Sequence, residues 1–138
     1  MTFLNKLHEQ RFDFLTQEDV TSPYDNERQA LFYILSGNSD LFSKRNYIYD
    51  FDERCISIDC LDSDKVDFST SAKALVRLGF NLYNGYSDDR TNPMDIFYSL
   101  DSSNYNIAMF ATDLRFGMAI TNEKTNDTEL EDDYDLSL

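Results

Sequence analysis

The stretch SAKALVRLGFNLYNGY, residues 71–86, is the most strongly patterned part of the chain. Its polar residues recur at i, i+4, i+8 and i+11 and so form one narrow stripe on a helix: Lys73, Arg77, Asn81 and Asn84. The other positions are apolar or small, as in a helix that is buried over most of its circumference. We therefore predict a buried helix over about 71–84 at the centre of the core.

Residues with helix-end preferences flank this segment. Ser69, Thr70 or Ser71 can cap its start, and Gly85 stands where a left-handed residue ends a helix. Gly79 lies inside the apolar surface, where it favours the close approach of a second helix.

Five further segments carry the helical period, and their predicted ranges are 2–17, 22–37, 39–45, 92–101 and 103–117. Cap residues favour their starts, namely Thr2, Ser22 ahead of Pro23, Ser39, and Asn92 ahead of Pro93. Gly37 and Gly117 favour their ends.

Residues 45–68 lack that period. Tyr47, Tyr49 and Phe51 alternate with polar residues, but no Asn-Gly or Asp-Gly turn joins two strands, so an irregular loop is favoured over a short hairpin. The chain as a whole predicts an all-α fold. We expect one domain over 1–120, with five or six helices around the central helix, and a disordered acidic tail over 121–138.

The chain is strongly acidic, with 26 acidic and 12 basic residues among 138 and a net charge of −14. Residues 123–138 carry −6 of this, which leaves −8 on the preceding 122 residues. Such a charge repels phosphate backbones, so direct nucleic-acid binding is not expected, and a protein with a basic surface is the natural partner. The alternative is that the acidity only keeps the protein soluble.

No apolar run approaches the length of a membrane span, and the first residues, MTFLNKLHEQRFDF, carry charges throughout, unlike a signal peptide. We expect a cytosolic protein. Cys55 and Cys60 are predicted to be reduced thiols, because a C-x4-C pair with one histidine in the chain cannot supply four zinc ligands. That histidine, His8, lies among charged residues and is predicted to be a surface side chain.

The acidic residues of the insert and the tail are the candidate partner-binding residues: Asp50, Asp52, Glu53, Asp62, Asp64, Glu129, Glu131, Asp132 and Asp133. A metal-binding regulator or metal-assisted hydrolase that uses Asp50, Asp52, Glu53 and Asp62 is the alternative, since carboxylates suit Mg²⁺ and Ca²⁺. The segment lacks the spacing of an EF-hand loop, and a solvated acidic loop is favoured. We assign no catalytic residue, metal or cofactor.

The polar stripe of the helix over 71–84 has two interpretations. In the first, Arg77 pairs with a carboxylate such as Asp95 or Asp101, while Asn81 and Asn84 satisfy backbone groups at the helix end. In the second, Lys73, Arg77, Asn81 and Asn84 line a groove that binds a ligand or an acidic group.

Four segments carry a resemblance to a known family: ALFYILSGNSDLF (30–42), YIYDFDE (47–53), SAKALVRLGFNLYNGY (71–86) and DIFYSLDSSNYNIAMFATDLRF (95–116). The chain resembles, over about 1–117, a family of small uncharacterised proteins found in bacteria and their mobile genetic elements. The resemblance implies a compact cytosolic domain and no catalytic residues. By analogy, small acidic proteins of phages and mobile elements often inhibit host nucleic-acid enzymes, including CRISPR nucleases.

Our functional hypothesis is therefore a non-enzymatic acidic interaction module. It would block the basic nucleic-acid-binding surface of such an enzyme through electrostatic complementarity. A monomer and a homodimer are both compatible with the sequence.

Overall fold

A computed structural model of the chain describes residues 1–117, which form seven α-helices, one short 3₁₀ helix and a two-stranded hairpin. The elements are α1 (Lys6–Asp19), α2 (Asn26–Gly37), α3 (Ser39–Ser43), α4 (Arg45–Ile48), β1 (Tyr49–Asp50), β2 (Cys55–Ile56), η1 (Ile58–Leu61), α5 (Thr70–Asn84), α6 (Pro93–Phe97) and α7 (Ser102–Phe116). The predicted all-α class is confirmed. The predicted tail lies outside the described residues.

Several helix ends follow the predicted caps. The side chains of Ser69 and Asn92 accept the backbone N–H three residues later, at the starts of α5 and α6. Gly85 and Gly117 end α5 and α7 in the left-handed conformation, with φ of 83° and 77°.

Three helices are capped by residues other than the predicted ones. Asp25, and not Ser22, caps α2, because its side chain accepts the N–H of Arg28 at 3.0 Å. Asn5, and not Thr2, caps α1, because its side chain accepts the N–H of His8 at 2.9 Å. Asn38, and not Ser39, caps α3 in the same way. Asn, Asp and Ser are about equally favourable as cap residues. The residue whose side chain can reach the free backbone N–H groups of the first turn therefore becomes the cap.

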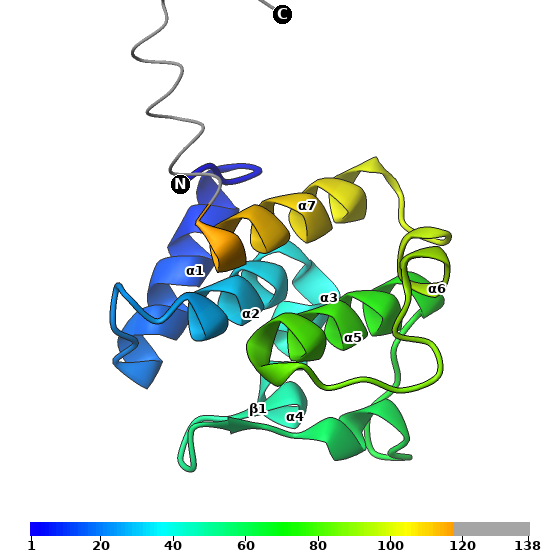
Figure 1. Cartoon of the computed structure of the whole chain (residues 1–138). Coiled ribbons are helices and arrows are strands. Elements are labelled where there is room, and N and C mark those ends of the chain that lie inside the picture. The colour runs from blue at the N-terminus through cyan, green and yellow to red at the C-terminus, as the bar shows by residue number, and fades with distance from the viewer. Residues whose placement is uncertain (118–138) are drawn as a thin grey trace, which may run out of the picture.

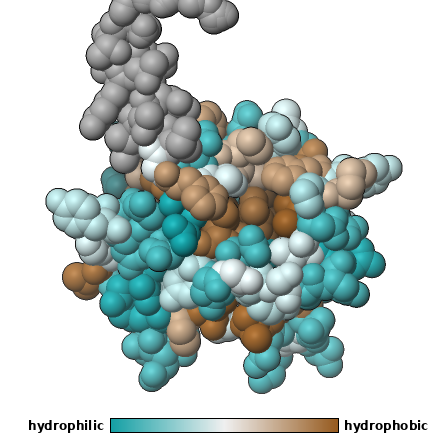
Figure 2. Space-filling view, viewed as in Figure 1, coloured by the Kyte–Doolittle hydropathy of each residue, from teal (hydrophilic) through white to brown (hydrophobic). Residues whose placement is uncertain are grey.

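Helix α2 occupies the centre of the fold and contacts α1, α3, α5 and α7. Figure 1 shows α2 between α1 and α5, with α7 across the top. Seven consecutive residues of α2, 30–36, are buried. This corrects the prediction that α5 is central, since α5 keeps a partly exposed polar stripe. In the same view, Figure 2 shows apolar side chains gathered in the middle of this face between hydrophilic flanks.

The predicted close approach at Gly79 is confirmed. A Cβ added to this residue of α5 would lie 3.0 Å from Leu31 Cδ1 of α2, which is closer than ordinary van der Waals contact. The missing side chain therefore sets the distance between the two most buried helices.

Residues 45–68 form a short helix and an antiparallel hairpin, in which Tyr49 pairs with Ile56 and Asp50 with Cys55. The favoured irregular loop is therefore wrong, and the hairpin alternative is right. The hairpin is held by aromatic packing, because the ring of Phe51 stacks on Phe32 of α2 at a centroid distance of 5.8 Å. Cys55 is exposed and Cys60 buried, and both are free thiols as predicted.

His8 is a buried core residue, which corrects the prediction of a surface side chain. It is 2% exposed. Its Nδ1 accepts the backbone N–H of Leu4 at 3.1 Å, so Nε2 carries the proton and donates to the Tyr33 carbonyl at 3.0 Å. Burial lowers the pKa of the imidazole and outweighs the opposing effect of the hydrogen bond to Tyr33.

This geometry predicts a pH dependence of folding. A pKa that is lower in the folded state than its ordinary 6.5 contributes stability above about pH 6.5, and this contribution falls as the pH drops below that value. The His8→Ala variant is expected to lose about 2–3 kcal/mol at neutral pH and to show less dependence on pH. Urea unfolding at pH 7.5 and 5.5 measures both, and an unchanged pH dependence in the variant would contradict this role.

Candidate functional site

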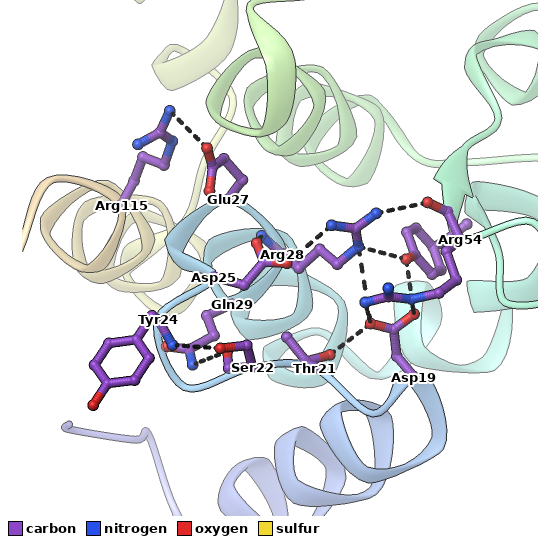
Figure 3. A network of polar contacts seen from close by, with 11 residues as sticks. Asp19, Thr21, Ser22, Tyr24, Asp25, Glu27, Arg28, Gln29, Arg54 and Arg115 are labelled. Carbon is purple, nitrogen blue, oxygen red and sulfur yellow. Dashed lines mark hydrogen bonds and ion pairs between the residues drawn. The ribbon is translucent and has the colours of Figure 1, made fainter.

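A buried carboxylate joins the end of α1 to the hairpin. The side chain of Asp19 is fully buried. It accepts hydrogen bonds from Tyr49 Oη at 2.8 Å, from Thr21 Oγ1 at 2.7 Å, and from Nε and Nη2 of Arg54 at 3.1 and 3.0 Å. Figure 3 shows Arg54 lying over Asp19 in this two-point contact. A buried charge is tolerated because it is paired and its lone pairs are satisfied.

Arg28 of α2 forms the second layer of this network. Its Nε donates to Tyr49 Oη at 2.9 Å, its Nη1 to Asp25 at 2.9 Å, and its Nη2 to the backbone carbonyl of Arg54 at 2.8 Å (Figure 3). Burial raises the pKa of Tyr49 to about 12, so the phenol stays protonated and donates to Asp19. The network thus connects α1, α2 and the hairpin.

The groups that surround Asp19 also explain why its carboxyl group is ionised although it is buried. Burial alone would raise the pKa of this carboxyl, but the hydrogen bonds from Arg54, Thr21 and Tyr49 outweigh it and hold the pKa below its usual value. Sequence reasoning missed this site. One signal was present, since His8, Phe12, Leu15 and Asp19 recur at i, i+4, i+7 and i+11 on the buried face of α1.

The Tyr49 hydroxyl is expected to be worth a measurable part of the stability. Tyr49→Phe leaves the buried Asp19 and the Nε of Arg28 without this partner, and should lower the free energy of unfolding by about 1–3 kcal/mol. Tyr24→Phe is the matched control, because Tyr24 is 91% exposed. Urea denaturation of both variants tests this, and equal midpoints would refute the assignment.

The hairpin also presents acidic side chains in a fixed arrangement. Asp50 Oδ1 accepts the backbone N–H groups of Asp52 and Glu53, each at 3.0 Å, and so closes the turn. Arg54 completes the turn with a positive φ of 56°. Asp52 and Glu53 are exposed at the tip. Of the predicted partner-binding residues, these three therefore lie together.

A hollow of about 370 Å³ adjoins this turn, and Glu18, Asp50 and Asp52 are the charged residues that line it, beside Tyr49 and Phe51. None of the three carboxylates forms an ion pair with another residue in 1–117. Glu18 was not singled out from the sequence, since only the contact between the end of α1 and the hairpin places it here. We call this hollow the acidic pocket.

The other acidic candidates are placed elsewhere. Asp62 and Asp64 are exposed in the segment after η1 and do not line the acidic pocket. Glu129, Glu131, Asp132 and Asp133 lie outside the described residues. Within residues 1–117, no three His, Cys, Asp or Glu side chains are grouped so as to hold one metal ion, so the structure offers no ligand set for the metal hypothesis.

The predicted polar groove is divided between two places. Asn81 Nδ2 donates to the Tyr86 carbonyl, and Asn84 Oδ1 accepts the Tyr86 N–H, both at 3.0 Å, so they hold the chain after α5 as the first interpretation expected. Lys73 and Arg77 instead line a hollow with Arg90. Among the described residues, Lys73 and Arg77 are therefore the members of the stripe that line one cavity together.

The partner of Arg77 is Asp88, at 2.9 Å from its Nε, and not the predicted Asp95 or Asp101. The segment after α5 folds back along the helix and brings this carboxylate to the stripe (Figure 1). Burial would raise the pKa of Asp88, but hydrogen bonds from Arg77, the Arg90 N–H and Thr91 lower it to about 2. Asp88 thus holds the returning segment in place.

Asp88 is expected to contribute to acid stability. Its folded pKa of about 2 lies below the ordinary value of 3.8, so its contribution is present above about pH 4 and is lost as the pH falls toward 2. Asp88→Asn should lower the free energy of unfolding at neutral pH by about 2 kcal/mol and flatten the acid limb. Thermal unfolding between pH 7 and pH 2 measures this, and Asp89→Asn, at an exposed neighbour, should behave like the wild type.

Comparison with known families places the chain. A family model matches residues 1–128. The chain belongs to a family of unknown function, DUF6075. The match extends beyond residue 117, where the resemblance seen in the sequence was expected to end, into the acidic C-terminal segment. No match was found among curated proteins or among solved structures.

The family description names no activity, so the function has to be inferred from the sites described above. Among residues 1–117, no helix combines the length and apolar character that crossing a bilayer requires.

Proposed function

We propose that the protein is a non-enzymatic interaction module that presents the acidic pocket and the hairpin tip to a basic surface of another protein. The observation that carries this proposal is the group of Glu18, Asp50 and Asp52, which line one hollow without an ion pair inside the described chain. Unpaired carboxylates at a concave surface favour the docking of Lys or Arg side chains.

The hairpin is suited to this role because it is already ordered. Asp50 is held by two backbone N–H groups, and Arg54 at the far side of the turn is held by Asp19. A partner that docks here does not have to order the turn, which reduces the entropic cost of association. A volume of about 370 Å³ admits a long basic side chain beside the Phe51 ring, which offers an apolar wall to its methylene groups.

The charge of the whole chain supports a partner with an extended basic surface. Residues 1–117 carry a net −8, and residues 123–138 add a net −6. Such a field steers association with a Lys/Arg-rich channel and competes with nucleic acid for it. The partner class we propose is a nucleic-acid-binding enzyme of host defence, such as a CRISPR nuclease, met by a protein of bacterial mobile elements or phages.

A charge reversal at the hairpin tests this proposal. Asp52→Lys should weaken partner binding about tenfold or more, since it sets a like charge against the basic surface. Asp13→Lys changes the net charge equally at an exposed position of α1 that does not line the acidic pocket, and should have a much smaller effect. Pull-down from a bacterial lysate at low and high salt, with mass spectrometry, identifies the retained proteins.

The expected result is a nucleic-acid-binding enzyme that is retained by the wild type and by Asp13→Lys, is lost with Asp52→Lys, and is displaced by high salt or by duplex DNA. Equal retention by all three proteins, or retention that salt does not affect, would contradict the proposed electrostatic mode.

A further inference from the structure

One hollow of this acidic protein has a cationic lining. It has a volume of about 420 Å³ and is lined by Phe68, Thr70, Lys73, Arg77 and Arg90. None of these residues is acidic, although residues 1–117 carry a net −8. We call this hollow the cationic pocket. It shares no lining residue with the acidic pocket.

The cationic pocket is built by two segments that Asp88 holds together. Lys73 and Arg77 lie one turn apart on α5. Asp88 accepts hydrogen bonds from Arg77 Nε and from the backbone N–H of Arg90, both at 2.9 Å. These bonds hold the segment after α5 against the helix and so place Arg90 beside it. The segment from α5 to α6 runs back along α5 in Figure 1. The cationic pocket therefore depends on the contact between Asp88 and Arg77.

The positive charge of the cationic pocket is only partly neutralised. Asp88 pairs with Arg77 through Nε alone, and within residues 1–117 the terminal nitrogens of Arg77 have no hydrogen-bond partner. In the same part of the chain, the side chains of Lys73 and Arg90 form no ion pair. The ammonium group of Lys73, the guanidinium group of Arg90 and the terminal nitrogens of Arg77 thus remain available to a ligand.

The start of α5 adds to this potential. Thr70 is the first residue of this 15-residue helix and lines the pocket. The first backbone N–H groups of a helix lack intrahelical acceptors, and the helix dipole places partial positive charge at this end. Phe68 also lines the pocket, and Lys44 Nζ lies over its ring at 5.5 Å from the centroid.

We propose that the cationic pocket binds a small molecule that carries phosphate. Two guanidinium groups, an ammonium group and a helix start form a donor set suited to a multiply charged oxyanion. The volume of about 420 Å³ falls in the range of ligand pockets and exceeds the size of one phosphate group, so the ligand extends further, along Phe68. This inference uses residues other than those of the proposed protein-interaction site and is independent of it.

Isothermal titration of the full-length protein with pyrophosphate and with ADP, in low-salt buffer free of phosphate, tests the proposal. We expect one binding site, with ADP binding more tightly than pyrophosphate because its ring system can reach Phe68. Lys73→Gln and Arg90→Gln should each weaken binding about tenfold, by removing one charge-assisted contact. Lys65→Gln removes the same charge at an exposed position outside the pocket and should bind like the wild type.

Several results would overturn the proposal. An absence of heat with both ligands at millimolar concentration would show that the pocket does not bind phosphate. An equal loss of affinity in Lys65→Gln and Lys73→Gln would show that binding depends on the net charge of the protein and not on the pocket. Tighter binding of citrate than of pyrophosphate would replace phosphate by carboxylate as the ligand chemistry. These variants leave Asp52 unchanged, so the outcome of the titration does not affect the outcome of the pull-down that tests the acidic hairpin.

Discussion

The buried carboxylate of Asp19 is the constraint on which the arrangement of the hairpin depends. Four hydrogen bonds from Tyr49, Thr21 and Arg54 converge on it, and Arg28 links Tyr49 back to α2. A charge without these partners would be too costly to bury, so α1, α2 and the hairpin must meet in one geometry. The acidic pocket follows directly, because Glu18 precedes Asp19 in α1 and Asp50 follows Tyr49 in β1.

The protein thereby separates its charges into two hollows of opposite sign. Within residues 1–117 the carboxylates of the acidic pocket form no ion pair, whereas at the other hollow Asp88 pairs with Arg77 and holds the backbone N–H of Arg90. A strongly acidic chain would be expected to neutralise its few basic residues. Arg28 and Arg54 are indeed used in this way at Asp19, whereas Lys73 and Arg90 form no ion pair within residues 1–117, and the proposed ligand site rests on this difference.

Much of the helical framework could be predicted because its signals are local. Ser69 and Gly85 delimit α5, Asn92 starts α6 and Gly117 ends α7, each through contacts within a few residues. The start of α1 was misplaced because two residues near it, Thr2 and Asn5, can both cap a helix. The hairpin was not favoured because its stability comes from Phe51 packing on Phe32, a contact that alternation over a few residues does not reveal.

The sequence by itself determined the all-α class, most helix ends, the buried face of α5 and the acidic character of the surface, since these depend on periodicity, cap chemistry and composition. Only the tertiary structure decided that α2 is central, that His8 and Asp19 are buried, that Arg77 pairs with Asp88, and that Glu18 and Arg90 belong to hollows. The physical reason is that burial and ion pairing depend on which distant segments meet. The sequence offered Asp95 and Asp101 as partners for Arg77, but the fold brings Asp88 to it.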